Sequence, residues 1–600
     1  MGTNTLPTRA QVPVELTWDL TTIYANVAAW ETDFAKVEGL IARLAEHQGK
    51  LATSADSLLA MLKDRDQVLM VLDNLWNYAH LRADEDTTVS ANKALRERAR
   101  QLFTNFGAAY SYAEPEILAM DESVLTGFLS ASNELAKYSF ELENLMRKKP
   151  HIRSQEVEEL LAQASLLHAG PSNVYDMLGD ADMEFPKLVD GNGERVRLTH
   201  GNYAEVFLMS PKKPVRLRAY KAMFGTYGKY RNTLSATYAA RVQSEIFEAK
   251  ARGHASTRAH RLFETNVPLS VYDSLISTVH ANIPRMTRYL EMRKRKLGLK
   301  KLNFCDLYVP LVGDVDYKPT YAEAKETVLQ AVAPLGAEYV AALRNGFDSR
   351  WVDVVENQNK ASGAYSSGGY QTAPYMLLNW QDSLESMFTL AHEAGHSMHS
   401  WHSRKHQPFH DSGYTIFVAE VASTLNEALL AHHLLQTSND DSMRAHIINH
   451  QLENIRQTLY RQTLFAEFEM IAHQRAEAGE VLTPDVLCEI HRDLNQKYYG
   501  AAVEMDDLIP VEWMRIPHFY NSFYVYQYAT GISAAMALTR QILSEGEPAV
   551  KRYLKFLSSG GSKYSIDLLR DAGVDLSSPK PVEQALDAFE DYLVEFEKLG

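Results

Sequence analysis

The first 180 residues carry a helical pattern of apolar positions. From about residue 25, apolar residues recur at intervals of three and four, as in SADSLLAMLKDRDQVLMVLDNLWNYAHLRA, which begins at Ser54. Polar residues fill the positions between them, so each segment would present one apolar stripe when helical. Ser54 is itself a suitable N-cap. The pattern therefore predicts a series of amphipathic helices over residues 25–180.

Two breaks interrupt this pattern before residue 330. Residues 182–203 alternate on both sides of Asp190-Gly191-Asn192-Gly193, a sequence typical of a tight turn, and this predicts a β-hairpin. Helices resume near Glu205 and continue to about residue 295. Residues 302–321 then read as a non-helical stretch.

A third break, at residues 360–380, predicts the main β-structure. The segment KASGAYSSGGYQTAPYMLLNW mixes Gly, Ser and aromatic residues and ends in an apolar run. We expect a flexible loop at residues 366–369 and a short strand at PYMLLNW. From residue 382 to the end the pattern is again mostly helical. The expected fold class is therefore mainly α, with one small β-sheet near residues 360–380.

Length and composition indicate how many domains the chain holds and which partners and locations are unfavourable for it. A chain of 600 residues is expected to hold several domains, and we place divisions at 1–115, 116–200 and 201–600, the second ending in the hairpin. The formal charge of −15 disfavours non-specific nucleic-acid binding. There are only two cysteines, the first twenty residues lack a leader pattern, and no apolar run is long enough to span a membrane. These features predict a cytoplasmic protein.

The segment TLAHEAGHSMH carries the chemistry that stands out. We expect a helix here, capped by Asp382 with Glu385 as its capping-box partner. His392 and His396 are then one turn apart on one face and can converge on one metal ion, with Glu393 beside them as a general base. This is the H-E-x-x-H pattern of zinc sites. The alternative is a helix whose histidines only contact the core or solvent.

Two neighbouring features favour the metal hypothesis. Gly395 is unfavourable inside a helix unless a close backbone approach requires it. Downstream, Glu420 lies in the apolar run FVAEVA, where a carboxylate is costly to bury unless it is paired or coordinated. We therefore predict His392, His396 and Glu420 as metal ligands. Glu427, seven residues later, is either a partner behind the ligands or an exposed helix charge.

His399 shares the face of the predicted metal ligands. It lies seven residues after His392, close to two helical turns. Because His392 and His399 would be about 10 Å apart along the helix axis, the three histidines cannot all reach one tetrahedral ion without strain. We prefer His399 near the site, with a role as an alternative ligand left open.

A stripe of tyrosines follows in IPHFYNSFYVYQYATG. Tyr520, Tyr524 and Tyr528 recur every four residues, which predicts one helical face, and His518 precedes them. An aromatic stripe is usually core. In a catalytic interpretation, the tyrosine hydroxyl and the histidine N–H donate to the oxyanion of a tetrahedral intermediate.

Several blocks together resemble the oligoendopeptidase F branch of the thimet oligopeptidase family of zinc peptidases. They occur in order along nearly the whole chain: WDLTTIYAN, YSFELENLMRKKPHIRSQEVEELLA, NVYDMLGDADMEFP, LFETNVPLS, HEAGHSMHS, FVAEVASTLNEALL and HFYNSFYVYQYATG. The resemblance implies a prolate, multi-helical zincin-type peptidase with a deep channel and one zinc ion. It implies His392, His396 and Glu420 as ligands and Glu393 as the base.

The resemblance also implies His518 and a tyrosine as transition-state donors, with Tyr528 preferred and Tyr524 behind it. The implied substrates are short unstructured peptides cut internally, and residues 363–370 could pair with the substrate backbone as an added strand. Two other hypotheses remain open. One is a non-catalytic peptide-binding scaffold, and the other is a peptidase that releases C-terminal dipeptides. Side-chain preference and oligomeric state are not readable from the sequence.

Overall fold

The structure is a computed structural model that describes residues 6–313, 315 and 317–599. It is mainly α-helical with small sheets, which confirms the predicted fold class. The chain divides into two compact units: unit 1 comprises residues 1–150, 317–433 and 538–573, and unit 2 comprises the remaining residues. The divisions predicted at residues 115 and 200 are not tested by these units and stay a prediction.

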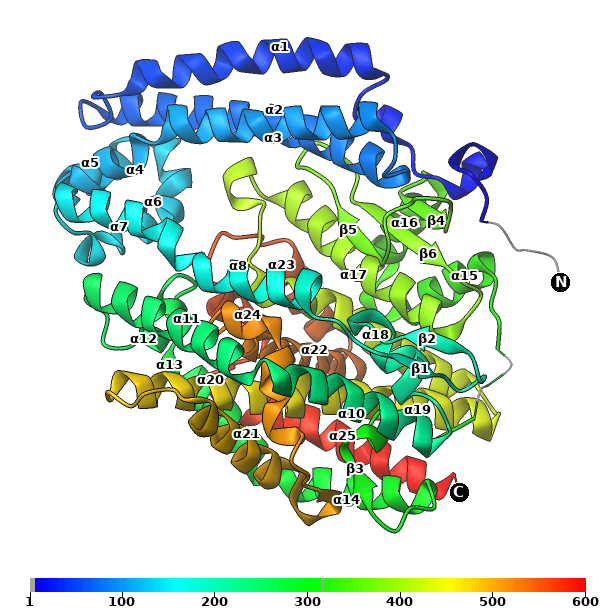
Figure 1. Ribbon diagram of the computed structural model, residues 1–600. Coiled ribbons are helices and arrows are strands. Elements are labelled where there is room, and N and C mark those ends of the chain that lie inside the picture. The colour runs from blue at the N-terminus through cyan, green and yellow to red at the C-terminus, as the bar shows by residue number, and fades with distance from the viewer. Residues whose placement is uncertain (1–5, 314, 316, 600) are drawn as a thin grey trace. The chain divides into compact units, whose positions relative to one another are not determined.

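Unit 1 begins with three long helices that lie side by side (Figure 1). Its helices are α1 (Val27–Leu44), α2 (Ala55–Glu85), α3 (Ser90–Tyr110), α4 (Ala113–Ala119), α5 (Glu122–Ala131), α6 (Ser139–Met146), α15 (Tyr321–Ala331), α16 (Ala337–Asp348), α17 (Leu384–His406), α23 (Glu547–Leu557) and α24 (Ser565–Ala572). Helices α18 (Ile416–Thr437) and α22 (Tyr526–Glu545) contain the unit boundaries at 433 and 537. Ser54 caps α2 as expected, since its hydroxyl accepts from the Ser57 N–H at 3.1 Å.

The sheet of unit 1 has three strands in the order β4-β6-β5. These are β4 (Val352–Val355), β5 (Tyr365–Ser367) and β6 (Tyr375–Trp380), with β4 parallel and β5 antiparallel to β6. The predicted strand PYMLLNW is confirmed as β6, and β5 and β6 pack against α17. The expected flexible loop at residues 366–369 is wrong for Ser366 and Ser367, because both pair with β6 and the Ser366 hydroxyl bonds to Ser397 Oγ at 2.8 Å.

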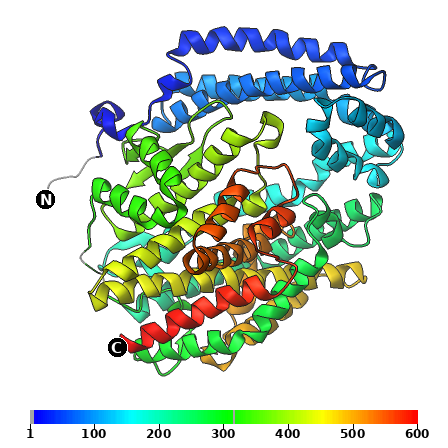
Figure 2. The same cartoon turned by 180° about the vertical axis from the view of Figure 1, so that it is seen from behind.

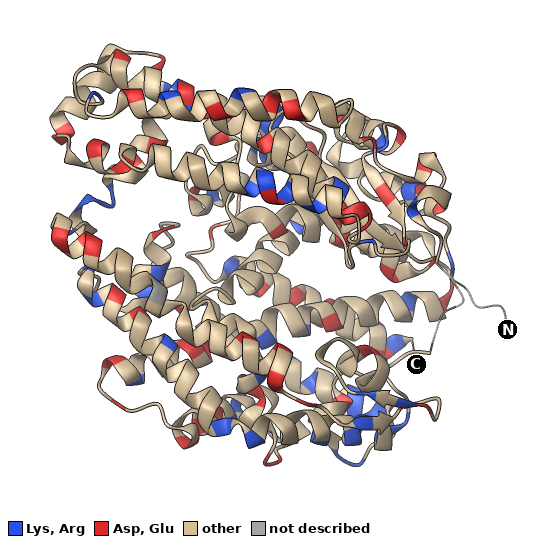
Figure 3. Cartoon of the chain, turned by 45° about the horizontal axis from the view of Figure 1, so that its top comes forward, with Lys and Arg blue, Asp and Glu red and all other residues tan. Residues whose placement is uncertain are grey.

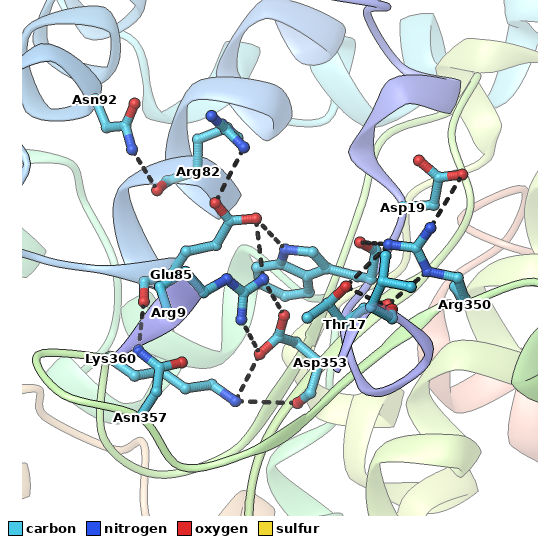
Figure 4. A network of polar contacts seen from close by, with 12 residues as sticks. Arg9, Thr17, Asp19, Arg82, Glu85, Asn92, Arg350, Asp353, Asn357 and Lys360 are labelled. Atoms are coloured by element: carbon cyan, nitrogen blue, oxygen red, sulfur yellow. Dashed lines mark hydrogen bonds and ion pairs between the residues drawn. The ribbon is translucent and has the colours of Figure 1, made fainter. Parts of the chain in front are cut away.

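A buried polar network ties the N-terminal segment to this sheet (Figure 4). Arg9 donates to Asp353 Oδ1 at 2.8 Å and to Glu85 Oε1 of α2 at 3.2 Å. The Lys360 ammonium lies 2.7 Å from the same Asp353 oxygen and donates to the Val355 carbonyl at 2.8 Å. The side chains of Asp353 and Lys360 are fully buried, so each charge depends on these partners.

Unit 2 contains the predicted hairpin and a second group of helices. Its helices are α7 (Gln155–His168), α8 (Gly170–Asp176), α9 (His200–Asn202), α10 (Lys213–Lys229), α11 (Arg231–Ala251), α12 (Thr257–Phe263), α13 (Leu269–Ala281), α14 (Ile283–Lys296), α19 (Asp441–Ile455), α20 (Arg461–Glu477), α21 (Pro484–Tyr499) and α25 (Lys580–Lys598). Figure 2 shows α25, in red, which packs on α19.

The strands of unit 2 form two short pairs. Strands β1 (Lys187–Val189) and β2 (Arg195–Arg197) form the predicted antiparallel hairpin, and Asp190 Oδ1 accepts two backbone N–H bonds in its turn. Strands β3 (Leu302–Asn303) and β7 (Val503–Glu504) pair in parallel. The predicted non-helical stretch 302–321 contains residues 314 and 316, which lie outside the described residues.

Charged residues are distributed along the helices of both units (Figure 3). Basic residues gather in the last turn of α14, where they face the negative end of the helix dipole: Arg293, Lys294, Arg295 and Lys296. Cys305 and Cys488 are both buried and unpaired. Among the described helices, none is long and apolar enough to cross a membrane.

Candidate metal centre

Helix α17 carries the H-E-x-x-H segment and begins one residue later than predicted. Its N-cap is Ser383, whose hydroxyl accepts from the Ser386 N–H at 3.1 Å. Ser383 has the extended backbone conformation of an N-cap, so its side chain can reach the first turn. The predicted cap Asp382 instead accepts from the Trp380 indole N–H at 2.8 Å.

Gly395 allows α18 to approach α17 closely. A Cβ atom added to Gly395 would lie 2.5 Å from the Ala422 carbonyl oxygen and 2.6 Å from Ser423 Cα. No side chain fits at these distances, so only glycine permits this crossing. The expectation of a close backbone approach at Gly395 is confirmed, and the approach brings the first turns of α18 beside the histidines.

Three side chains converge where the two helices cross. The Nε2 atoms of His392 and His396 are 3.2 Å apart, and each lies 3.4 Å from Glu420 Oε2. Between 19% and 36% of each of the three side chains stays exposed, so the triangle is open on one side. The three predicted ligand residues are thus brought together, and they are the one cluster with metal-ligand geometry in the described chain.

The dimensions and chemistry of this triangle fit a tetrahedral metal ion. Ligand atoms bonded to zinc at about 2.0–2.1 Å stand about 3.3–3.4 Å apart in a tetrahedral site. Burial alone would lower the pKa of His392, but hydrogen bonds to Glu420 and Glu427 outweigh it and raise the pKa to about 10. Burial opposes ionisation of Glu420, yet its two histidine partners hold its pKa well below the usual range. The cluster therefore attracts positive charge, which a metal ion would supply.

Glu427 lies behind the cluster and is not an exposed helix charge. Its Oε1 atom is 2.5 Å from His392 Nδ1, and 15% of its side chain is exposed. A carboxylate at Nδ1 holds the proton on that nitrogen and leaves the Nε2 lone pair facing the cluster. The first of the two predicted alternatives for Glu427 therefore describes its position.

Glu393 is buried beside the cluster and has an unused oxygen. The residue is 6% exposed, and its Oε2 atom has no hydrogen-bond partner among the described residues. Burial raises the pKa of Glu393 by more than the nearby His392 and His396 lower it. A carboxylate of raised pKa with a free oxygen is suited to take up a proton.

His399 lies outside the triangle. Its ring stacks on Tyr414, with centroids 3.7 Å apart and planes 7° from parallel, and burial lowers its pKa to about 3. The residue is therefore a neutral core histidine on the same helix. Sequence reasoning missed Tyr414, which precedes α18 and also bonds through its hydroxyl to Ser400 Oγ at 2.8 Å.

The predicted donors lie in unit 2, where they form a group of their own. The hydroxyl of Tyr528 is 3.3 Å from His518 Nε2, and the Tyr524 ring lies edge-on to Tyr528 with centroids 5.5 Å apart. Burial lowers the pKa of His518, so its ring is neutral near pH 7. The structure gives no placement of this group relative to the triangle of unit 1.

The prediction of one helical tyrosine face is wrong. Tyr520 ends a 3₁₀ turn, Pro517–Tyr520, Tyr524 lies in an irregular segment, and α22 begins only at Tyr526. Tyr520 instead bonds to Thr237 Oγ1 at 2.8 Å and packs on Tyr175. The helix is interrupted because Asn521, with a ψ of 77°, and Phe523, with a positive φ of 59°, both lie outside the right-handed helical region.

Comparison with known proteins identifies the family to which these sites belong. The family model described as peptidase family M3 matches residues 206–588, and that described as oligopeptidase F matches residues 116–185. The chain is a member of peptidase family M3. The chain is 46% identical to the oligopeptidase PepF of Bacillus subtilis over 596 residues, which cover 99% of this chain and 89% of that one.

Solved structures agree with this membership. A crystal structure from Chlamydophila abortus matches with a TM-score of 0.93 at 36% identity, over 99% of this chain and 100% of that one. The oligoendopeptidase F of Enterococcus faecium matches with a TM-score of 0.74 at 35% identity, over 95% and 98%. The family predicted by resemblance is confirmed. As a member of family M3 the chain is a metallopeptidase, and its His-His-Glu cluster can hold the metal ion.

Proposed function

We propose that this family M3 peptidase is a zinc-dependent oligoendopeptidase that hydrolyses internal bonds of short, unstructured peptides. The observation that carries the proposal is the triangle of His392, His396 and Glu420, whose edges of 3.2 and 3.4 Å suit a tetrahedral ion. Two histidines and one carboxylate form the ligand set of hydrolytic zinc sites, in which a fourth position stays open. The cytoplasmic location predicted from the low cysteine count remains part of the proposal.

Zn²⁺ held by these three residues would supply a Lewis acid that polarises the scissile carbonyl and acidifies water. Glu393 takes a proton from the attacking water and delivers it to the leaving amine, a role that suits its raised pKa and free oxygen. Glu427 holds His392 in the tautomer that directs Nε2 to the ion. His518 and Tyr528 donate hydrogen bonds to the oxyanion, a role that rests on the family resemblance.

The sheet of unit 1 supports a way of binding peptide backbone. Strand β5 is the edge of the order β4-β6-β5, so one side of it has no strand partner in the described sheet. Ser366 joins β5 to α17 through Ser397. An extended peptide could add to this edge through main-chain hydrogen bonds, which give affinity with little side-chain selectivity. The deep channel and the exclusion of folded proteins stay predictions.

The test combines product mapping with metal exchange. The protein is incubated with one unstructured peptide of about twenty residues, and the products are identified by mass spectrometry. We expect internal cuts that stop after chelation and return when Zn²⁺ is added. Serial loss of C-terminal dipeptides would favour the other enzymatic hypothesis. Metal-loaded protein that binds the peptide without cutting it would favour the scaffold.

A stably folded protein serves as the matched substrate for the size limit. Short peptides taken from its sequence should be cut while the folded protein stays intact. Comparable cleavage of both would contradict the proposed restriction to unstructured peptides.

A further inference from the structure

Phe523 adopts a backbone conformation that is unusual for a bulky residue. Its φ of 59° lies in the left-handed region, which favours glycine and costs other residues of order 1–3 kcal/mol. Such a conformation persists only when the surroundings fix it. Along the chain, Phe523 is midway between His518 and Tyr528, the two predicted donors of unit 2.

The Phe523 ring and backbone are both held by neighbouring helices. The residue is 3% exposed, and its ring packs on His473 of α20 and Tyr272 of α13, with centroids 4.7 and 5.9 Å away. The backbone N–H donates to Glu469 Oε1 of α20 at 3.0 Å. Because φ is the rotation about the N–Cα bond, the held N–H on one side of that bond and the held ring on the other together fix the left-handed conformation.

Burying the carboxyl group of Glu469 at this position costs free energy unless the group makes a compensating contact. It is fully buried, its Oε2 atom has no hydrogen-bond partner among the described residues, and burial raises its pKa well above the usual range. Of the charged groups near it, Arg261 favours the ionised form of Glu469 and Glu245 opposes it, while burial is the largest influence on its pKa. Its hydrogen bond to the Phe523 N–H is the contact that explains its presence.

A second side chain holds the preceding residues of the same turn. Arg261 of α12 donates to the Ser522 carbonyl at 3.2 Å and to Asn521 Oδ1 at 2.9 Å. The Asn521 N–H in turn donates to the His518 carbonyl at 2.9 Å. The path from His518 to Tyr528 is thus fixed from α12 on one side and from α20 on the other.

We propose that Glu469 is a positioning residue for the His518–Tyr528 pair. This inference rests on the proposed function, which assigns these two groups to the oxyanion. By holding Phe523 at positive φ between the 3₁₀ turn and the start of α22 at Tyr526, Glu469 sets the 3.3 Å separation between the His518 and Tyr528 polar atoms. A donor misplaced by about 1 Å can lower the rate about 10²-fold although it remains present.

Two variants of Glu469 distinguish the effect of its hydrogen bond from the effect of its buried bulk. In Glu469→Gln the side chain keeps a carbonyl oxygen for the Phe523 N–H, whereas Glu469→Leu removes the acceptor and keeps the bulk. Glu467→Leu is the matched control, because Glu467 is also buried on α20 but binds Tyr498 and Lys497. For each variant kcat, KM and hydrogen exchange of peptides covering residues 516–528 are measured.

We expect Glu469→Leu to lower kcat about 10–100-fold with KM nearly unchanged, since the affected groups act in the transition state. Exchange in residues 516–528 should become faster in this variant. Glu469→Gln should stay within about threefold of the wild type in kcat and retain slow exchange, since the acceptor remains. Glu467→Leu should lose thermal stability but keep kcat and the exchange pattern of this segment.

Unchanged exchange at residues 516–528 in Glu469→Leu would overturn the inference, and so would an equal loss of kcat in Glu467→Leu. If Glu469→Leu does not fold, Arg261→Met tests the same turn from its other side, with a smaller loss of kcat expected and unchanged kcat as the contradicting result. The exchange measurement does not depend on turnover. A wild type that cuts no peptide would therefore refute the proposed function, while the exchange data still decide what Glu469 holds in place.

Discussion

In unit 1 the candidate ligands project from two regular helices that cross at Gly395, whereas in unit 2 His518 and Tyr528 stand on either side of an irregular turn. The spacing of His392 and His396 along α17 is enough to bring them together, because a helix repeats every 3.6 residues. The spacing of the tyrosines has no such meaning, because Phe523 breaks the repeat. A functional group on a regular element is held by that element, but one beside a turn needs residues elsewhere to hold it.

The largest expected effect concerns the base of unit 1. Glu393→Gln keeps the size and burial of the side chain but cannot accept a proton, so kcat should fall about 10²–10⁴-fold. Metal content and thermal stability should stay near those of the wild type, because Glu393 is not part of the triangle. Kinetics on protein of measured zinc content check this prediction. Near-normal turnover in the loaded variant would remove Glu393 from the mechanism.

The two carboxylates of α18 should differ in their effect on the metal. Glu427→Ala removes the partner of His392 Nδ1, a change that typically weakens metal binding about 10–100-fold. Glu420→Ala should weaken it more, because it removes one corner of the triangle itself. Competition with a chelator of known affinity compares the two variants. If Glu427→Ala shows the greater loss, the ligand role has been given to the wrong carboxylate.

Tyr528→Phe tests the donor of unit 2. Losing one oxyanion donor typically lowers kcat about 10²–10³-fold, and KM should change little because the contact forms in the transition state. Tyr524→Phe is the comparison variant, since Tyr524 is the neighbouring hydroxyl and the second choice for the same role. The reverse pattern, with Tyr528→Phe near neutral, would exchange the roles of the two tyrosines.

Gly395→Ala should disturb the crossing of the two metal-bearing helices. The added methyl group would meet Ala422 O at 2.5 Å, and overpacking of this kind typically costs about 1–3 kcal/mol. Gly39→Ala in α1 is the control: a Cβ there meets nothing within 4 Å, and the change should stabilise the helix by about 0.5–1 kcal/mol. Thermal unfolding and zinc content check both. Equal behaviour of the two variants would show that the crossing tolerates a side chain.

The smallest expected effect concerns the turn in unit 2 that contains Phe523. Phe523→Gly and Phe523→Ala both lose the buried ring, but only alanine retains a Cβ that disfavours positive φ. The glycine variant should therefore be more stable by about 1 kcal/mol, in spite of its larger unfolded-state entropy. Equal denaturant midpoints would mean that the turn relaxes once the ring is gone.

The contrast between regular elements and irregular turns also decides which parts of the fold could be predicted from the sequence. The fold class, the hairpin and strand β6 could be predicted, because each follows from a repeat or a turn signal in adjacent residues. Strand β4 and the pairing of Ser366 and Ser367 could not, since a four-residue strand that includes Asp353, or two serines, is too short to show a periodicity of its own.

For single site residues too, the sequence predicts only what a local pattern reveals. Glu420 was found because a carboxylate in an apolar run needs a partner. Glu469 offers the same signal between Phe468 and Met470, but its partner is a backbone N–H more than fifty residues away, which no local pattern identifies. His399 shares the face of the ligands by spacing, yet its stacking on Tyr414 depends on how the segment before α18 returns to α17.

The network around Asp353 has a consequence for how the protein can be handled. Trimming the first twenty residues as if they were a dispensable tail would delete Arg9 and Trp18, which bind Asp353 and Glu85. Asp353 would then keep Lys360 but lose Arg9 as a cationic partner, in the sheet that packs on α17. Affinity tags and fusions are therefore best joined ahead of Leu6. If a shortened protein has lost activity, the loss of the Arg9 and Trp18 contacts should be tested as the cause before a defect in the active site is inferred.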